Sequence, residues 1–428
     1  GSGCMSTGEP SRKITVPANG LPDLTDTPQK LRLAAKRLRA GTGPVAVDTE
    51  RASGYRYGQD AYLVQLRRDG VGTLLIDPVG TGRDFSCIND ALTGVEWILH
   101  AADQDMPCLA KLGMRPDALF DTELAARILG REKRGLGHLI EDTLGWHLAK
   151  EHSAADWSVR PLPTAWLNYA ALDVELLIDL RSALLTELEL AGKLQWALAE
   201  FEFERTAPPR PERIDPWRHM HGAGKVTTAR GRAILRNLWL TREEIAKAQD
   251  LPPVKVLPHY AIVAVAKRMP NSRKQLRAIR EMSSRDARAY MEQWWKAVDS
   301  AMKLPESQLP KPIDLAPAGK VPELRVWSRR YPLHFEVLQA VRETVHSYAA
   351  QLTLIQENLL YPGLQRKLAW YWHPGMDVAE YLADNGARAW QIHQLAQALQ
   401  LRLEGLGLTQ AQLQADRAYK REAGSKKR

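Results

Sequence analysis

The stretch that decides the fold reads Val45-Ala46-Val47-Asp48-Thr49-Glu50. Three small apolar residues in a row are typical of a buried strand, and two carboxylates follow where that strand ends. Because side chains two positions apart on a strand point to the same face, we expect Asp48 and Glu50 to lie side by side. Two further Asp-x-Glu pairs occur, Asp121-Thr122-Glu123 and Asp173-Val174-Glu175, and the first pair differs from them in its place at the end of the strand expected from Val45 to Val47. The first pair is therefore the first candidate for a functional site.

The sequence around this strand predicts an α/β domain over residues 28–206. Short apolar runs at 62–66 and 73–76, separated by the turn residues Asp69-Gly70, predict two more strands, and 96–100 predicts a fourth. Apolar residues at helical spacing predict helices, which we place at 106–112, 122–129, 136–144 and 166–190. Strands followed by helices make α/β the expected class.

More carboxylates occur at places where such a sheet brings segments together. Asp105 follows the strand at 96–100 and opens a helix, although an acid there can also cap the helix N-terminus. Tyr169 and Asp173 are four positions apart and share one face of a helix. Several carboxylates from distant segments are what two-metal phosphodiester cleavage needs, with cations about 4 Å apart. Taken singly, Asp105 also fits a helix cap, and Tyr169 also fits the rim of a packed helix.

Taken together and in this order, the acids resemble the motifs of the DEDD exonuclease superfamily, and within it the ribonuclease D family. The resemblance covers residues 28–206. It rests on the stretches 45–50 with 62–66, 99–105 with 120–126, 156–162, and Asn168-Tyr169-Ala170-Ala171-Leu172-Asp173. The resemblance implies an α/β RNase H-like exonuclease domain, with a mixed sheet flanked by helices, that removes nucleotides from RNA 3′ ends.

The same resemblance implies a role for particular residues. Asp48, Glu50, Asp105 and Asp173 would be the ligands of two divalent cations, Mg²⁺ or Mn²⁺, and Tyr169 would orient the attacking water. The histidine subclass has His where this chain has Asn168, so the tyrosine subclass is expected. The residues expected to contact RNA are Arg51, Gln65, His100 and Tyr169. Arg51 stands where family members often have an apolar residue, and Asp121 either supports the site or only caps its helix.

The rest of the chain predicts helices and linkers. The first helical block resembles an HRDC domain in the stretches 233–239, 252–257, 264–270 and 275–279; the second resembles HRDC only in position, length and helical pattern. Tryptophans and a tyrosine in these blocks (Trp294, Trp295, Trp370, Tyr371, Trp372) can stack on bases, but core packing is their commoner use.

The expected division of the chain is 1–27 tag and N-terminal extension, 28–206 exonuclease domain, 207–304 first HRDC domain, 305–322 Pro-rich linker, 323–408 second HRDC-like domain and 409–428 basic tail. The tail is expected to be disordered from Lys420.

The net charge of +9 is unevenly distributed along the 428 residues. Residues 1–206 hold 23 Lys and Arg against 29 Asp and Glu, whereas residues 207–428 hold 36 against 21. A basic half attracts phosphate chains, although basic helices can also be ordinary solvated surface. We therefore expect the helical half to supply RNA affinity, and a chain ending near Glu204 to keep the chemistry.

The remaining features narrow the class of protein. Cys4, Cys87 and Cys108 form no Cys-x-x-Cys pair, which leaves neither a zinc knuckle nor a disulfide framework. No apolar stretch is long enough to span a membrane, and a cytoplasmic monomer that acts on tRNA precursors or other structured RNA is expected. Two alternatives stay open: a 3′→5′ DNA exonuclease, and a non-catalytic RNA-binding protein with a degenerate nuclease fold.

Overall fold

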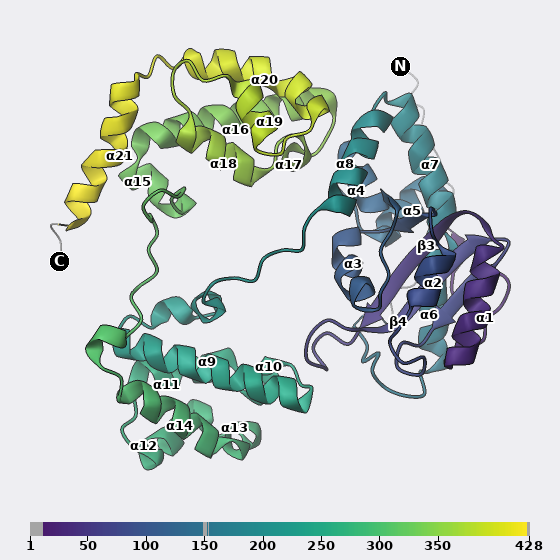
Figure 1. Ribbon diagram of the computed structural model, residues 1–428, viewed down its shortest axis with the longest axis horizontal. Helices are drawn as coiled ribbons and strands as arrows, with labels where there is room; N and C mark the ends of the chain where they lie inside the picture. Colours follow the sequence, from purple (N-terminus) through teal and green to yellow (C-terminus); the bar gives the residue numbers. More distant parts are fainter. Residues whose placement is uncertain (1–11, 149–151, 153, 426–428) are drawn as a thin grey trace, which may run out of the picture.

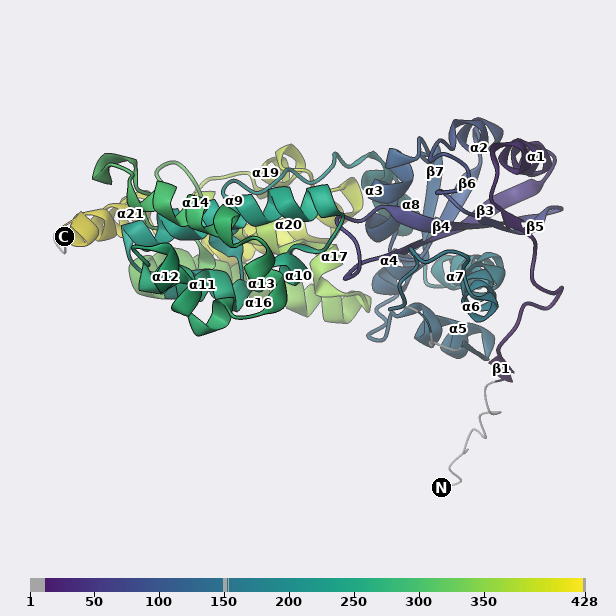
Figure 2. The same ribbon diagram turned by 90° about the horizontal axis from the view of Figure 1, so that it is seen from below.

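The computed structural model describes residues 12–148, 152 and 154–425, and its first half is built on a mixed six-stranded sheet (Figures 1 and 2). The strand order is β2-β5-β4-β3-β6-β7, with β4 antiparallel to β3 and β5, and β6 and β7 parallel to β3. The strands are β1 (Arg12–Ile14), β2 (Leu24–Thr25), β3 (Thr42–Arg51), β4 (Ala61–Asp69), β5 (Gly72–Ile76), β6 (Glu96–Leu99), β7 (Ala118–Asp121) and β8 (Trp146–Leu148). A separate parallel pair joins β1 to β8. The predicted α/β class is confirmed.

Helices cover both faces of this sheet, as Figure 2 shows. They are α1 (Pro28–Arg39), α2 (Ser86–Ala91), α3 (Ala102–Lys111), α4 (Thr122–Ile128), α5 (Leu136–Leu144), α6 (Thr164–Glu175), α7 (Leu177–Leu190) and α8 (Leu194–Thr206). Val45 and Val47 of β3 pack into the core formed with α1, α2 and α3, whereas Ala46 packs into the core formed with α4, α5, α7 and α8. The alternation of β3 therefore sends Thr49 toward α3 and Asp48 toward the opposite face.

The long helix predicted at 166–190 is instead two helices. Helix α6 ends at Glu175 and α7 begins at Leu177, with Leu176 between them. The break lets each helix bury its apolar side against a different surface: Ala170 and Ala171 of α6 pack near Leu63 of β4, while α7 packs with α4 and α5. The apolar spacing runs unbroken through Leu176, so the sequence alone showed one helix.

The second half of the described chain is helical and contains two separate hydrophobic cores. The first is formed by α9 (Ala229–Gln249), α10 (Pro253–Val256), α11 (His259–Arg268), α12 (Arg273–Ala278), α13 (Arg285–Ala289) and α14 (Met291–Met302), with 3-10 turns at Pro216–His219, Ala223–Lys225 and Arg280–Met282. A further 3-10 turn, Glu306–Gln308, lies in the Pro-rich segment. The second core is formed by α15 (Trp327–Arg330), α16 (Pro332–Leu352), α17 (Gln356–Leu359), α18 (Pro362–Tyr371), α19 (Val378–Asp384), α20 (Ala389–Glu404) and α21 (Gln410–Ser425), after a 3-10 turn at Leu324–Val326. The domain limits drawn from the sequence stay a prediction.

The tryptophans of these blocks are mostly core residues. Trp294, Trp370 and Trp372 are buried, whereas Trp295 is half-buried and Tyr371 is 38% exposed. The tail expected to be disordered from Lys420 is helical as far as Ser425, and 426–428 lie outside the described residues. Across the part of the chain that the structure describes, no helix combines the length and apolar character needed to cross a membrane.

Both helical parts contact the first half of the chain. The second helical part packs on α8: Arg388 forms an ion pair with Glu200 at 2.8 Å, and Trp390 stacks on Trp196. The first helical part contacts the loop between β3 and β4, where the hydroxyl of Tyr57 donates to Glu243 at 3.1 Å. Both helical parts lie on the same side of the nuclease part, one beside the other, as Figure 1 shows.

Candidate metal centre

Asp48 and Glu50 lie on β3 beyond the point where β6 stops pairing with it. Strand β6 pairs with β3 only at Val45 and Ala46, so the end of β3 has one free edge. Its other edge pairs with β4, which places Gln65 opposite Asp48. The two carboxylates share the face that α6 covers, as the spacing predicted.

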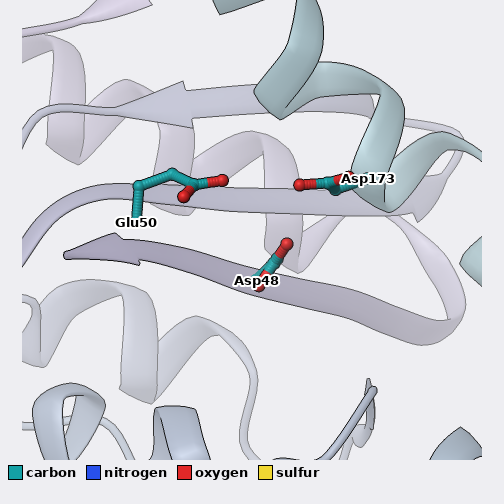
Figure 3. Close-up of side chains that lie close together, drawn as sticks. All are labelled: Asp48, Glu50 and Asp173. Atoms are coloured by element: carbon teal, nitrogen blue, oxygen red, sulfur yellow. The ribbon is translucent and has the colours of Figure 1, made fainter. Parts of the chain in front are cut away.

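Asp173 comes to the same place from α6. The alanines before it, Ala170 and Ala171, are fully buried, and their small side chains let the helix lie close to the sheet. Ligand oxygens of Asp48, Glu50 and Asp173 all lie within 4.8 Å of one another. Figure 3 shows the three side chains directed toward a common point. Among the described residues this is the group that can hold a metal ion.

The three acids repel one another; Glu50 is buried, and Asp48 and Asp173 are half-buried. Burial raises the pKa of Asp48 well above its ordinary value, and the charges of Asp105 and Asp173 raise it further. Burial, followed by the charge of Glu50, likewise raises the pKa of Asp173. Burial, followed by the charge of Asp48, raises the pKa of Glu50. A cation that binds here replaces protons and removes the repulsion, so the donor set fits a divalent metal.

Gln65 holds Glu50 in place. The side chain of Gln65 is fully buried, and its Nε2 donates to Glu50 Oε1 at 3.2 Å and to the carbonyl oxygen of Ala170 at 3.4 Å. This amide therefore faces the metal centre and α6 instead of solvent, and its expected contact to RNA stays a prediction. It joins β4, β3 and α6 at the site.

Asp105 lies in the first turn of α3, as expected, but its carboxylate is held outside the group of three acids. Its Oδ1 accepts from Thr49 Oγ1 at 2.5 Å and from Arg51 Nη1 at 3.0 Å. Burial raises the pKa of Asp105, while the Thr49 hydroxyl and the Arg51 guanidinium lower it. Sequence reasoning missed Thr49, although strand alternation places it on the side of α3.

Asp121 braces the start of α3, and His100 contacts the start of α4. Asp121 is buried and accepts from the backbone nitrogens of Ala101 and Ala102 at 3.0 and 2.9 Å. It also caps α4 by accepting from Glu123 N at 2.9 Å. His100 Nδ1 lies 2.9 Å from Thr122 Oγ1. Asp121 thus caps its helix and also ties α4 to the helix that carries Asp105.

Tyr169 lies one turn before Asp173 on α6 and is half-buried. Its ring lies 6.4 Å from that of Trp157 and 6.0 Å from that of His152, measured between centroids. Helical spacing puts the phenol beside Asp173, as predicted. The aromatic neighbours limit how far the ring can turn.

Comparison with family models assigns three regions of the chain. Residues 23–189 match the model described as 3′-5′ exonuclease, residues 231–298 match the HRDC domain, and residues 320–403 match the model described as 3′ to 5′ exonuclease C-terminal domain. The last model covers the region in which the sequence suggested a second HRDC-like domain.

Related proteins and structures agree with these matches. Ribonuclease D of Gluconacetobacter diazotrophicus is 32% identical over 307 residues, which cover 68% of this chain and 75% of that protein. Ribonuclease D of Escherichia coli K12 is 28% identical over 364 residues, 83% of this chain and 91% of that protein. A crystal structure of a Bifidobacterium adolescentis protein has a TM-score of 0.85 at 39% identity and covers 92% of this chain and 100% of that one. The structure of Escherichia coli RNase D, described as an exoribonuclease involved in structured RNA processing, has a TM-score of 0.65 at 25% identity, covering 90% and 98%.

Proposed function

The chain belongs to the ribonuclease D family, and from that premise we propose which residues carry out its chemistry and on which RNA they act. The protein is a 3′→5′ exoribonuclease that depends on divalent metal. The observation that carries this function is the group of three carboxylates, within 4.8 Å of one another, inside the region that matches the exonuclease model. Intact acids also argue against a non-catalytic protein with a degenerate site.

Asp48, Glu50 and Asp173 are proposed to hold one cation, and Asp48 with Asp105 a second. Mg²⁺ and Mn²⁺ fit an all-carboxylate donor set. When bound, such cations lower the pKa of water and stabilise charge on the phosphate. The protein residues determine where this happens: Gln65 orients Glu50, and the Thr49 hydroxyl and Asp121 orient Asp105 and its helix.

Tyr169 is proposed to orient the attacking water. The phenol is anchored by α6 beside Asp173 and by the rings of Trp157 and His152. It is not proposed as a metal ligand, because a neutral phenol is a weak donor beside four carboxylates. His100 is less suited to contact RNA than to brace Thr122, since burial lowers its pKa and favours the neutral ring.

Structured RNA, such as tRNA precursors, is the proposed substrate. Residues 207–428 hold 36 Lys and Arg against 21 Asp and Glu, and this excess is proposed to bind phosphates that lie away from the cleaved end. The protein is proposed to act in the cytoplasm as a monomer. Discrimination against DNA requires contacts to the 2′-hydroxyl, for which Arg51 and Tyr169 are proposed as neighbours.

A time course on 5′-labelled single-stranded RNA and DNA, each with Mg²⁺, Mn²⁺ or EDTA, tests this function. We expect a ladder that shortens from the 3′ end of RNA, slower loss of DNA and no loss in EDTA. A circular RNA of the same sequence serves as the control for the need of a free end. Rapid cutting of the circle, or cleavage that persists in EDTA, would exclude the proposed reaction.

A further inference from the structure

Arg51 is the last residue of β3, and its guanidinium turns back onto the start of α3. Its Nη1 donates to Asp105 Oδ1 at 3.0 Å, to the carbonyl oxygen of Gln104 at 2.8 Å and to Thr49 Oγ1 at 3.3 Å. The Thr49 hydroxyl donates to the same Asp105 oxygen at 2.5 Å. One carboxylate oxygen thus receives two donors, and the guanidinium is fixed at three points.

This arrangement divides the four acids into two sets. Asp48, Glu50 and Asp173 have oxygens within 4.8 Å of one another and form the group that can take a cation as it stands. Asp105 is absent from that group, although its charge acts on Asp48. The guanidinium of Arg51 therefore binds the same carboxylate that a second cation would need.

The ion pair is too sheltered to be an incidental surface contact. The side chains of Arg51 and Asp105 are 22% and 7% exposed. A buried carboxylate that loses its partner is strongly destabilised unless another positive charge replaces it. A cation that binds Asp105 must therefore displace the Arg51 guanidinium. The displaced guanidinium then needs another anion as its partner.

We propose that the Arg51–Asp105 ion pair keeps Asp105 out of the metal centre, so that the first divalent cation binds at Asp48, Glu50 and Asp173, and the second binds tightly only when a phosphate of the RNA 3′ end draws Arg51 away. The guanidinium fork suits a phosphate, because it presents several N–H donors in one plane. Arg51 is then a positioning residue that links RNA binding to completion of the metal centre. This inference rests on the proposed metal-dependent function.

Isothermal titration with Mn²⁺, followed by electron paramagnetic resonance to detect paired ions, tests the inference on the full chain. The wild-type protein is expected to bind one Mn²⁺ tightly and a second weakly. Arg51→Gln is expected to tighten the second site by about tenfold or more, the scale of changes to groups that hold a ligand. Adenosine 5′-monophosphate, which carries a terminal phosphate, is expected to tighten the second site of the wild type but not that of Arg51→Gln.

Matched variants distinguish a failure of this inference from a failure of the proposed metal-dependent function on which it rests. Arg67→Gln removes the same charge from a side chain on β4 that donates to Thr73, and should leave both sites unchanged. Arg51→Lys keeps the charge but not the three-point contact, and should fall between wild type and Arg51→Gln; it also serves if Arg51→Gln folds poorly by circular dichroism. A second site as weak in Arg51→Gln and Arg51→Lys as in the wild type would overturn the inference. If Asp48→Asn still bound both ions, the proposed metal centre itself would be wrong.

Discussion

Trp196 of α8 and Trp390 of α20 stack with ring centroids 4.9 Å apart and planes inclined by 12°. The Trp390 Nε1 also donates to Glu200 Oε1 at 2.9 Å, and Arg388 binds the same carboxylate. Lys193 Nζ donates to the carbonyl oxygen of Thr353 at 2.7 Å. The second helical part is therefore bound to the nuclease part by apolar and buried polar contacts together. A chain ending near Glu204 would cut α8 and expose this surface. Such a truncation is therefore a poorer test than the sequence suggested of whether the helical half supplies RNA affinity and the first half the chemistry.

Trp390→Ala is expected to destabilise this interface by about 2–4 kcal/mol, because it removes a packed ring and leaves Glu200 without one donor. The nuclease part and the second helical part should then melt in separate steps, which scanning calorimetry would show. Leu401→Ala, on the same helix and 67% exposed, is the matched control. One unchanged cooperative transition in Trp390→Ala would mean that the interface contributes little.

Tyr57→Ala is expected to release the first helical part from the loop between β3 and β4. The Tyr57 hydroxyl bonds Glu243, its backbone nitrogen donates to Asp250 Oδ1 at 3.2 Å, and its ring packs on the first helical core. The radius of gyration from small-angle X-ray scattering should increase, since the linkers at 207–215 and 305–322 then hold this part alone. Tyr260→Ala, at a tyrosine that is 64% exposed, should leave it unchanged. Identical scattering from the two variants would contradict the proposed docking.

Glu204→Gln is expected to stabilise the protein increasingly as the pH rises. Burial, with the charge of Asp121 next in size, raises the pKa of Glu204 to about 10. The folded protein therefore holds a proton that the unfolded chain has released above the ordinary glutamate pKa, so the stability contributed by this group falls from that pH up to about 10. A glutamine keeps a donor toward Asp121 and does not ionise.

Urea unfolding at pH 5, 7 and 9 checks this pH dependence. The gain of Glu204→Gln over wild type should be small at pH 5 and exceed about 1 kcal/mol at pH 9. Glu202→Gln is the control on the same helix, because hydrogen bonding to Arg205 lowers the pKa of Glu202 instead. A gain that is equal at all three pH values would argue for a packing effect.

The sequence pattern within single strands and helices predicted the strand that carries Asp48 and Glu50. The features that it did not predict depend on contacts between residues far apart in the chain. Alternation along β3 placed Asp48 and Glu50 on one face, and helical spacing placed Tyr169 beside Asp173, because both are properties of a single element. The Arg51–Asp105 pair joins residues 54 positions apart and depends on how α3 meets the sheet. The burial of Gln65 opposite Asp48 likewise depends on the β3–β4 register. Nothing in the sequence of either helix indicated that Trp196 would stack on Trp390.

Tyr169→Phe is expected to slow hydrolysis by about 100-fold, a typical contribution of a positioned acid–base group, without changing Mn²⁺ affinity. The phenol lies beside Asp173 but is not proposed as a ligand. Single-turnover rates on a 3′-labelled RNA, together with Mn²⁺ titration, measure the two effects separately. Tyr62→Phe on β4 is the control. Unchanged single-turnover rates would remove Tyr169 from the mechanism.

Asp48→Asn is expected to abolish activity and to raise the melting temperature of the metal-free protein. The carboxylate is half-buried and near the charges of both Asp105 and Asp173, so the amide removes repulsion that only protons or a cation otherwise relieve. Relief of about 1 kcal/mol would raise the melting temperature by about 2–4 °C in a domain of this size. Hydrolysis should fall by at least about 1,000-fold, because a shared ligand is lost. With saturating Mn²⁺ the order of stability should reverse, since the wild type then gains binding energy that the variant lacks. Thermal melts with EDTA and with Mn²⁺ test both signs, and a variant less stable than wild type in EDTA would show that Asp48 is held by contacts other than the metal.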